Sequence, residues 1–240
     1  MTSLNNVSLT QNIWQQLLWK CRTFSSTFTT VLIVQIIFSV LSFGSSGSRG
    51  GSFGAIQYNE SVYSLDFLVI ISIFSAIMLG WLLATQSIRN DNFSVVTTNF
   101  TETVSTLLFL VVLSAFTVFS ALSSLYITVF TRLLFFDQVM VFKSIFIDIS
   151  TLFIFSFFVL IAGSASFFAK TLFDISKITF LLLTIAIIYS VRTWGISESA
   201  FFEFILVQSM GELLGKVLLV LTILWGLTIV IRKRREVIRR

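Results

Sequence analysis

The sequence predicts an all-α integral membrane protein with about six transmembrane helices. Of its 240 residues, 56% are hydrophobic and 11% are charged, and the mean hydropathy is +0.97. A soluble domain would carry roughly 25% charged residues, which would form a polar face on its elements. Apolar runs also recur at the length that a bilayer requires. We therefore expect one transmembrane domain over residues 1–240 and no soluble domain.

Six segments approach the length of a membrane span, which is about 20 apolar residues for a hydrocarbon core of about 30 Å. The fifth is the shortest, and its start is left open between 170 and 178. Because the chain has no proline, helix breaks fall to glycine and serine clusters. The expected spans are 24–43, 65–84, 106–130, 145–168, 178–191 and 213–231.

The distribution of Lys and Arg predicts the orientation, because cationic loops remain on the cytoplasmic side. With both termini inside, eleven of the sixteen cations lie inside and five lie outside. Six of the eleven belong to the segment 232–240, which reads as a basic cytoplasmic tail after the last span. We expect a multi-pass protein of the cell membrane with both termini in the cytoplasm.

Ahead of the first span, residues 5–22 are predicted to form an interfacial amphipathic helix. The alternative is a plain N-terminal extension of the first span. The two predicted faces are Ile13, Trp14, Leu17, Leu18 and Cys21 on the apolar side, and Gln15, Gln16 and Lys20 on the polar side.

Two outer segments differ in composition. The stretch 44–54 is rich in glycine and serine, which is typical of a flexible loop. The stretch 195–211 is apolar but too short to cross the bilayer twice. We expect it to form an outer half-helix or re-entrant element before the last span, where protein or water satisfies its backbone.

The residue types argue against an enzyme. The chain has no histidine and one cysteine, Cys21, which removes the usual metal ligands and the common acyl-transfer triad. The nearest approach to a phosphate-binding loop, 211–217, has the wrong glycine spacing and lacks the Ser or Thr that holds magnesium. We expect no catalytic residue, metal or cofactor, and any ATP hydrolysis would occur on a partner subunit.

Charged residues in or near the spans are candidates for a substrate path, because charges in hydrocarbon are costly. A structural role at helix ends or between helices is the favoured alternative. Asp66, Asp148, Glu212 and Lys216 are these candidate path or packing charges, and the last two are spaced to pair along one helix.

The last span also begins with two glycines spaced four residues apart. Gly211 and Gly215 form a small-xxx-small pattern that favours close helix packing.

The inner segment 87–105 is the most informative polar stretch. At about 20 residues it exceeds the two to eight that usually join bundled helices, which favours an ordered functional element over an ordinary loop. Phe93 is an aromatic that could anchor in a partner's groove. The residues predicted to contact a partner here are Arg89, Asp91, Asn92, Phe93 and Glu102.

Four features together resemble the membrane subunit of an ABC-type exporter of the second class. They are the amphipathic entry helix, the inner segment IRNDNFSVVTTNFTETVS, the apolar element before the last span, and the basic ending RKRREV. In many members the inner segment has an acidic residue followed by a Gly-Thr-Leu type turn. The stretch from Asp91 to Thr98 lacks both the glycine and that order, which weakens the subfamily assignment more than the family one.

The resemblance implies a permease that forms the substrate path as a dimer with a second copy or a paralogue. The inner segment would then contain the coupling helix that docks on a separate cytoplasmic ATPase, and membrane lipid would surround the dimer. No nucleic acid partner is implied.

Two other classes of function remain open. One is a structural or assembly subunit of a membrane complex. The other is an ion-coupled secondary transporter, which would place acidic residues near the middle of the bilayer, where these spans are nearly free of charge.

Overall fold

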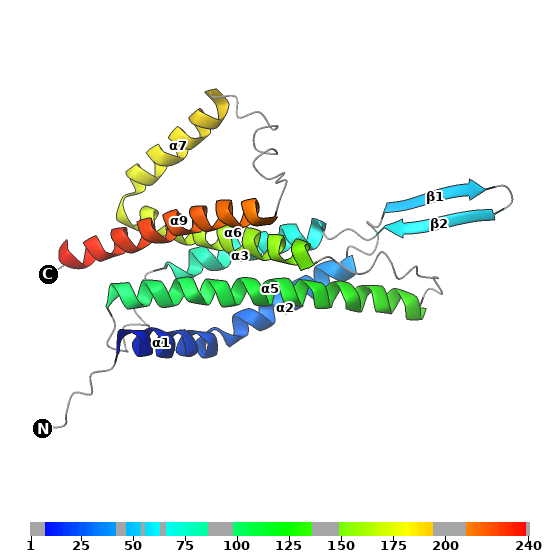
Figure 1. Ribbon diagram of the computed structural model, residues 1–240, viewed down its shortest axis with the longest axis horizontal. Coiled ribbons are helices and arrows are strands. Elements are labelled where there is room, and N and C mark those ends of the chain that lie inside the picture. The colour runs from blue at the N-terminus through cyan, green and yellow to red at the C-terminus, as the bar shows by residue number, and fades with distance from the viewer. Residues whose placement is uncertain are drawn as a thin grey trace, which may run out of the picture. The chain divides into compact units, whose positions relative to one another are not determined.

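A computed structural model describes residues 8–41, 47–53, 56–62, 66–85, 98–135, 149–193 and 210–238 (Figure 1). These residues form seven helices and one β-hairpin. The helices confirm the expected class, a helical membrane protein. Their bounds are α1 Leu9–Thr23, α2 Ser25–Leu41, α3 Asp66–Leu83, α5 Asn99–Phe135, α6 Ile149–Ile175, α7 Lys177–Thr193 and α9 Met210–Ile238.

Three helices in the described part of the chain are long and apolar enough to cross a membrane. They lie at Asn99–Thr128, Ser150–Ile175 and Gly211–Lys233. A fourth span results if α1 and α2 are taken as one bent pair, and two shorter apolar helices cover Leu68–Leu83 and Lys177–Ala186. Every predicted span therefore corresponds to a helix, but the number that fully crosses the membrane remains a prediction.

The N-terminal region forms two helices rather than one. Helices α1 and α2 meet at Phe24 with a bend of 51°. The break favours a separate entry helix over a straight extension of the first span. Within α1, Gln16 and Lys20 of the expected polar side are buried against the protein, while Trp14 and Leu18 of the expected apolar side are exposed.

The segment predicted to be a flexible loop contains a strand. Strand β1 (Gly47–Phe53) pairs in antiparallel fashion with β2 (Ile56–Val62), in a register that sets Gly47 opposite Val62 and Phe53 opposite Ile56. Glycine and serine content predicted a flexible loop here, but backbone hydrogen bonds to a neighbouring segment outweigh low intrinsic strand propensity.

The chain divides into two compact units. The first contains 1–22, 76–111 and 160–240, and the second contains 23–75 and 112–159. Helices α3, α5 and α6 each contribute part of their length to both units.

In the first unit, α3 and α6 are in backbone contact. A Cβ placed on Gly80 would lie 2.2 Å from the carbonyl oxygen of Gly163. Ser166 Oγ donates to the carbonyl of Ile77 at 2.6 Å, next to this contact. Trp225 of α9 donates through Nε1 to Ser164 Oγ at 3.0 Å. Small and hydroxyl side chains thus hold three helices together, as is typical inside membranes.

In the second unit, α2, α3 and α5 surround a buried amide. Gln35 is fully buried and donates from Nε2 to Ser72 Oγ at 2.9 Å and to the carbonyl of Thr117 at 3.1 Å. Its Oε1 accepts a hydrogen bond from Ser120 Oγ. The rings of Phe28 and Phe116 meet edge to face at 4.9 Å. The amide has both donors and its acceptor occupied, so its burial between apolar helices carries little penalty.

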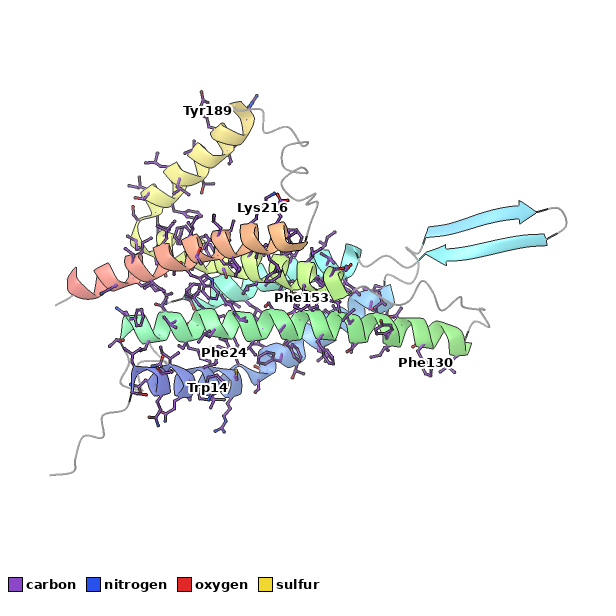
Figure 2. The ribbon with its side chains drawn as sticks, in the orientation of Figure 1. Trp14, Phe24, Phe130, Phe153, Tyr189 and Lys216 are labelled. Atoms are coloured by element: carbon purple, nitrogen blue, oxygen red, sulfur yellow. The ribbon has the colours of Figure 1, made fainter. Side chains whose placement is uncertain are left out.

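Helix α7 is apolar and largely exposed. Figure 2 shows its side chains, with Tyr189 labelled, and Ile178, Leu182 and Ile188 are each more than half exposed. Only 11% of the most apolar 18-residue stretch of α9 is buried, compared with 61% of the corresponding stretch of α5. Lipid or another membrane subunit would cover these surfaces in a bilayer.

Candidate functional site

Three charged side chains from three helices meet in the first unit. Lys20 of α1, Glu102 of α5 and Arg232 of α9 are only 2%, 1% and 6% exposed. Arg232 Nη1 donates to Glu102 Oε2 at 2.8 Å, and Lys20 Nζ lies 4.0 Å from Glu102 Oε1. We call these three residues the ionic cluster.

The start of α5 positions the acid of the cluster. Thr98 caps the helix, because its Oγ1 accepts the backbone N–H of Thr101 at 3.3 Å. Glu102 follows in the first turn, where the positive end of the helix dipole stabilises a carboxylate. The local sequence thus explains both where α5 begins and why an acid is tolerated there.

Helix α1 docks on this turn through two residues one turn apart. Gln16 donates from Nε2 to Thr101 Oγ1 at 3.2 Å and accepts from Ser105 Oγ at 3.1 Å. Lys20 Nζ donates to the Glu102 carbonyl at 3.1 Å and to Ser105 Oγ at 2.8 Å, and a third bond goes to Thr106 Oγ1. The ammonium group is therefore held by a carbonyl and two hydroxyls, with the carboxylate slightly farther away.

Helix α9 reaches the same turn through one residue. The guanidinium carbon of Arg232 lies 4.4 Å from the ring centroid of Phe167, in addition to the hydrogen bond from Arg232 to Glu102. Stacking on an aromatic face and a charge-assisted hydrogen bond are both favoured by a guanidinium group.

The charges of the cluster do not balance. Among the described residues, two buried cations share one acid, and both lie near the positive end of α5. Glu102 is the group that compensates them. Its removal would leave two buried cations close together, which is costly in any low-dielectric site.

A second group of cations and aromatic rings lies where α6 passes into α7. Lys170 Nζ is 2.5 Å from Asp174 Oδ1, 5.4 Å from the ring centroid of Trp81 and 5.0 Å from that of Phe173. Lys177 Nζ lies 5.9 Å from the Phe173 centroid. Tryptophan and lysine side chains of this kind are typical of the boundary between lipid and water.

The structure corrects the expected surroundings of Glu102. Sequence patterning placed this residue in a polar inner segment, whereas α5 begins at Asn99 and buries the carboxylate in the ionic cluster. The hydroxyl residues around it are compatible with helix because they bond back to their own backbone, as Thr106 does to the Glu102 carbonyl at 2.8 Å.

Other predicted site residues have different outcomes. Asp66 is the first residue of α3. Glu212 and Lys216 form the expected pair along α9, with Oε1 and Nζ 2.6 Å apart, and both side chains are partly exposed. Outside the described residues lie Arg89, Asp91, Asn92, Phe93 and Asp148, together with residues 195–209 of the expected outer element.

The two glycines expected to pack closely have no neighbour in the described part of the chain. No atom lies within 4 Å of a Cβ built on Gly211 or Gly215. The close glycine contact is made instead by Gly80 and Gly163. The packing role of Gly211 and Gly215 therefore stays a prediction.

Sequence reasoning missed Lys20 and Arg232. It assigned Lys20 to the polar face of the N-terminal helix and Arg232 to the tail. The signal that could have found them is Glu102 itself, because an acid at the start of a long apolar helix requires a cation, and both lie close to apolar runs.

Among the described residues, no group of three or more His, Cys, Asp or Glu side chains lies close enough together to hold a metal ion. Comparisons of the chain with protein-family models, with curated proteins and with solved structures find no match. The function must therefore be argued from the sequence and the geometry.

Proposed function

We propose that the protein is the permease subunit of an ATP-driven exporter, coupled to a separate cytoplasmic ATPase and paired with a second permease copy or a paralogue. The permease performs no covalent chemistry itself. Its part is to bind substrate differently in inward-facing and outward-facing states.

One observation carries the proposal: the ionic cluster ties together three segments with inner-side features. These are the entry helix α1, the first turn of α5, which lies within the inner segment 87–105, and the end of α9 where the basic tail begins. A partner that moved the inner segment would act on a helix whose first turn is joined to two others.

The position of Glu102 also bears on the ion-coupled alternative. A proton or ion relay needs acids along the span, whereas Glu102 sits in the first turn of α5 and is paired with Arg232. The cluster therefore fits a joint between helices better than a step in an ion path.

Purification of the protein with its native partners tests the proposal. We expect a stoichiometric cytoplasmic ATPase whose hydrolysis depends on this subunit. A stable complex that contains no ATPase would favour the structural or assembly role, and transport that persists without ATP in proteoliposomes would favour the secondary transporter.

A pair of variants tests the inner segment. Phe93→Ala is expected to reduce ATPase binding severalfold, because an aromatic anchor is the usual energetic centre of such a contact. The matched control is Phe153→Ala, which removes a ring of the same size from the exposed surface of α6 (Figure 2). Equal loss of ATPase in both variants would argue against a docking role for the segment.

A further inference from the structure

Arg232 and Lys20 approach the same carboxylate unequally. Arg232 bonds directly to Oε2 at 2.8 Å, whereas the nearest carboxylate oxygen of Glu102, Oε1, lies 4.0 Å from Lys20 Nζ. A small movement of the lysine or of the carboxylate would convert that separation into a direct ion pair. Lys20 is therefore available as an alternative ion-pair partner of the Glu102 carboxylate.

The two cations are also anchored differently. Lys20 is fixed to α5 by hydrogen bonds to the Glu102 carbonyl, Ser105 and Thr106, and Gln16 supports it one turn away. Arg232 belongs to α9, whose most apolar 18-residue stretch is only 11% buried. Elements with few buried contacts are the ones that move at least cost.

From this asymmetry we propose that the ionic cluster is a two-state switch in which α9 is the moving element. In the closed state Arg232 holds Glu102. In the open state α9 withdraws with Arg232, and Lys20 closes on Glu102, so the carboxylate is never left buried and unpaired. The proposal concerns the cluster itself and goes beyond the exporter assignment, on which it does not depend.

The single cysteine offers a direct test. Cys21 lies on α1 next to Lys20 and is partly exposed, and Lys233 on α9 is exposed. A spin label on Cys21 and a second on the Lys233→Cys variant of the full chain in lipid nanodiscs would report the distance between the two helices. We expect two distance populations.

Substitution of the two cations should shift the populations in opposite directions. Arg232→Gln removes the partner of the closed state and should favour the longer distance by about tenfold, the effect of one charge-assisted hydrogen bond. Lys20→Met removes the partner of the open state and should favour the shorter distance. The matched control is Glu212→Gln, which breaks the exposed pair on the same helix and should leave both populations unchanged.

Several results would overturn the switch. One is a single distance that neither variant changes, and another is a shift of both variants in the same direction. Thermal unfolding of each variant keeps the test decisive if one of them is unstable. The switch requires the chain to tolerate loss of the Arg232 contact, so failure of the Arg232→Gln variant to fold would contradict it. An unfolding temperature of the Arg232→Gln variant above that of the Lys20→Met variant would support it.

Discussion

Glu102 is the residue on which the ionic cluster depends. It compensates two buried cations and accepts a hydrogen bond from the Arg232 guanidinium, while its backbone carbonyl accepts one from Lys20. Each cation can lose its direct contact with the acid and keep other partners, as Lys20 keeps its two hydroxyls. Loss of the acid removes the carboxylate that both cations share in the described part of the chain.

Glu102→Gln is therefore expected to destabilise the protein strongly, by about 3–5 kcal/mol, the usual cost of breaking a buried ion pair from one side. Thermal unfolding in detergent or nanodiscs measures the change. Glu212→Gln serves as the control and should change stability by less than about 1 kcal/mol, because its pair with Lys216 is partly exposed. Equal stability of the two variants would contradict the importance of the cluster.

Removal of the Gln35 side chain should cost less stability, because the hydroxyl groups bonded to it also have other hydrogen-bond partners. Ser72 also donates to the Leu68 carbonyl at 2.6 Å, and Ser120 also donates to the Thr117 carbonyl at 3.0 Å. Each hydroxyl therefore has a partner inside its own helix.

Gln35→Leu is accordingly expected to cost only about 0.5–2 kcal/mol, in the range measured for hydrogen bonds between membrane helices. Gln35→Glu should cost more, because a carboxylate would face the Thr117 carbonyl that the amide now donates to. Unfolding of both variants under the same conditions gives the comparison. A larger loss of stability in Gln35→Leu than in Gln35→Glu would mean that side-chain packing, and not polarity, determines the stability contributed by this site.

At the scale of the elements, the contact of α3 with α6 relies on Gly80, which lies against the backbone of Gly163. The 2.2 Å approach of a Cβ on Gly80 to the Gly163 carbonyl leaves no room for any side chain, because the obstacle is backbone. The helices must separate if Gly80 gains a side chain, whereas a Cβ on Gly163 would have only ordinary contacts, the nearest at 3.5 Å.

Gly80→Ala should therefore destabilise the protein by about 1–3 kcal/mol, as overpacking does. Gly226→Ala is the control, since no atom lies within 4 Å of a Cβ there, and it should be neutral or stabilising by up to about 1 kcal/mol through helix propensity. A Gly80→Ala protein with unchanged thermal unfolding would refute the backbone contact.

Helix identity was predictable from the sequence, and helix contacts were not. Apolar runs place each helix because hydrocarbon demands satisfied backbone groups. Helix α5 begins at Asn99, seven residues before the predicted start of the span at 106, and its first hydroxyl residues look polar in sequence although they bond back to the helix. The contacts between helices could not be predicted, because they depend on packing that no local pattern encodes. Examples are the contact of Gly80 with Gly163 and the contacts of Glu102 with two cations that are distant in sequence.

At the scale of the whole molecule, the orientation rests on the distribution of cations. We expect both termini in the cytoplasm and the β1–β2 hairpin outside. The single cysteine makes the expectation simple to test, because Cys21 belongs to the N-terminal helix α1.

A membrane-impermeant maleimide should label Cys21 in inside-out vesicles and not in intact cells. The converse control is Ser52→Cys in a Cys21→Ser background, which places the thiol in strand β1 and should label in intact cells. Labelling of Cys21 from outside would invert the proposed topology and remove the cytoplasmic site expected for an ATPase.

The hydroxyl side chains along α5 have a consequence for how easily that helix can slide. Seven of them donate to the carbonyl four residues earlier in the same helix: Thr103, Thr106, Thr117, Ser123, Ser124, Thr128 and Thr131. Axial displacement of α5 would leave these donors satisfied, even against lipid. Resistance to such a displacement then comes from side chains of other helices that donate hydrogen bonds to α5, Gln35 and Ser39 among them. The hydroxyls of α5 that are satisfied within the helix therefore add no polar cost to its axial displacement, and any such cost lies in the contacts with other helices.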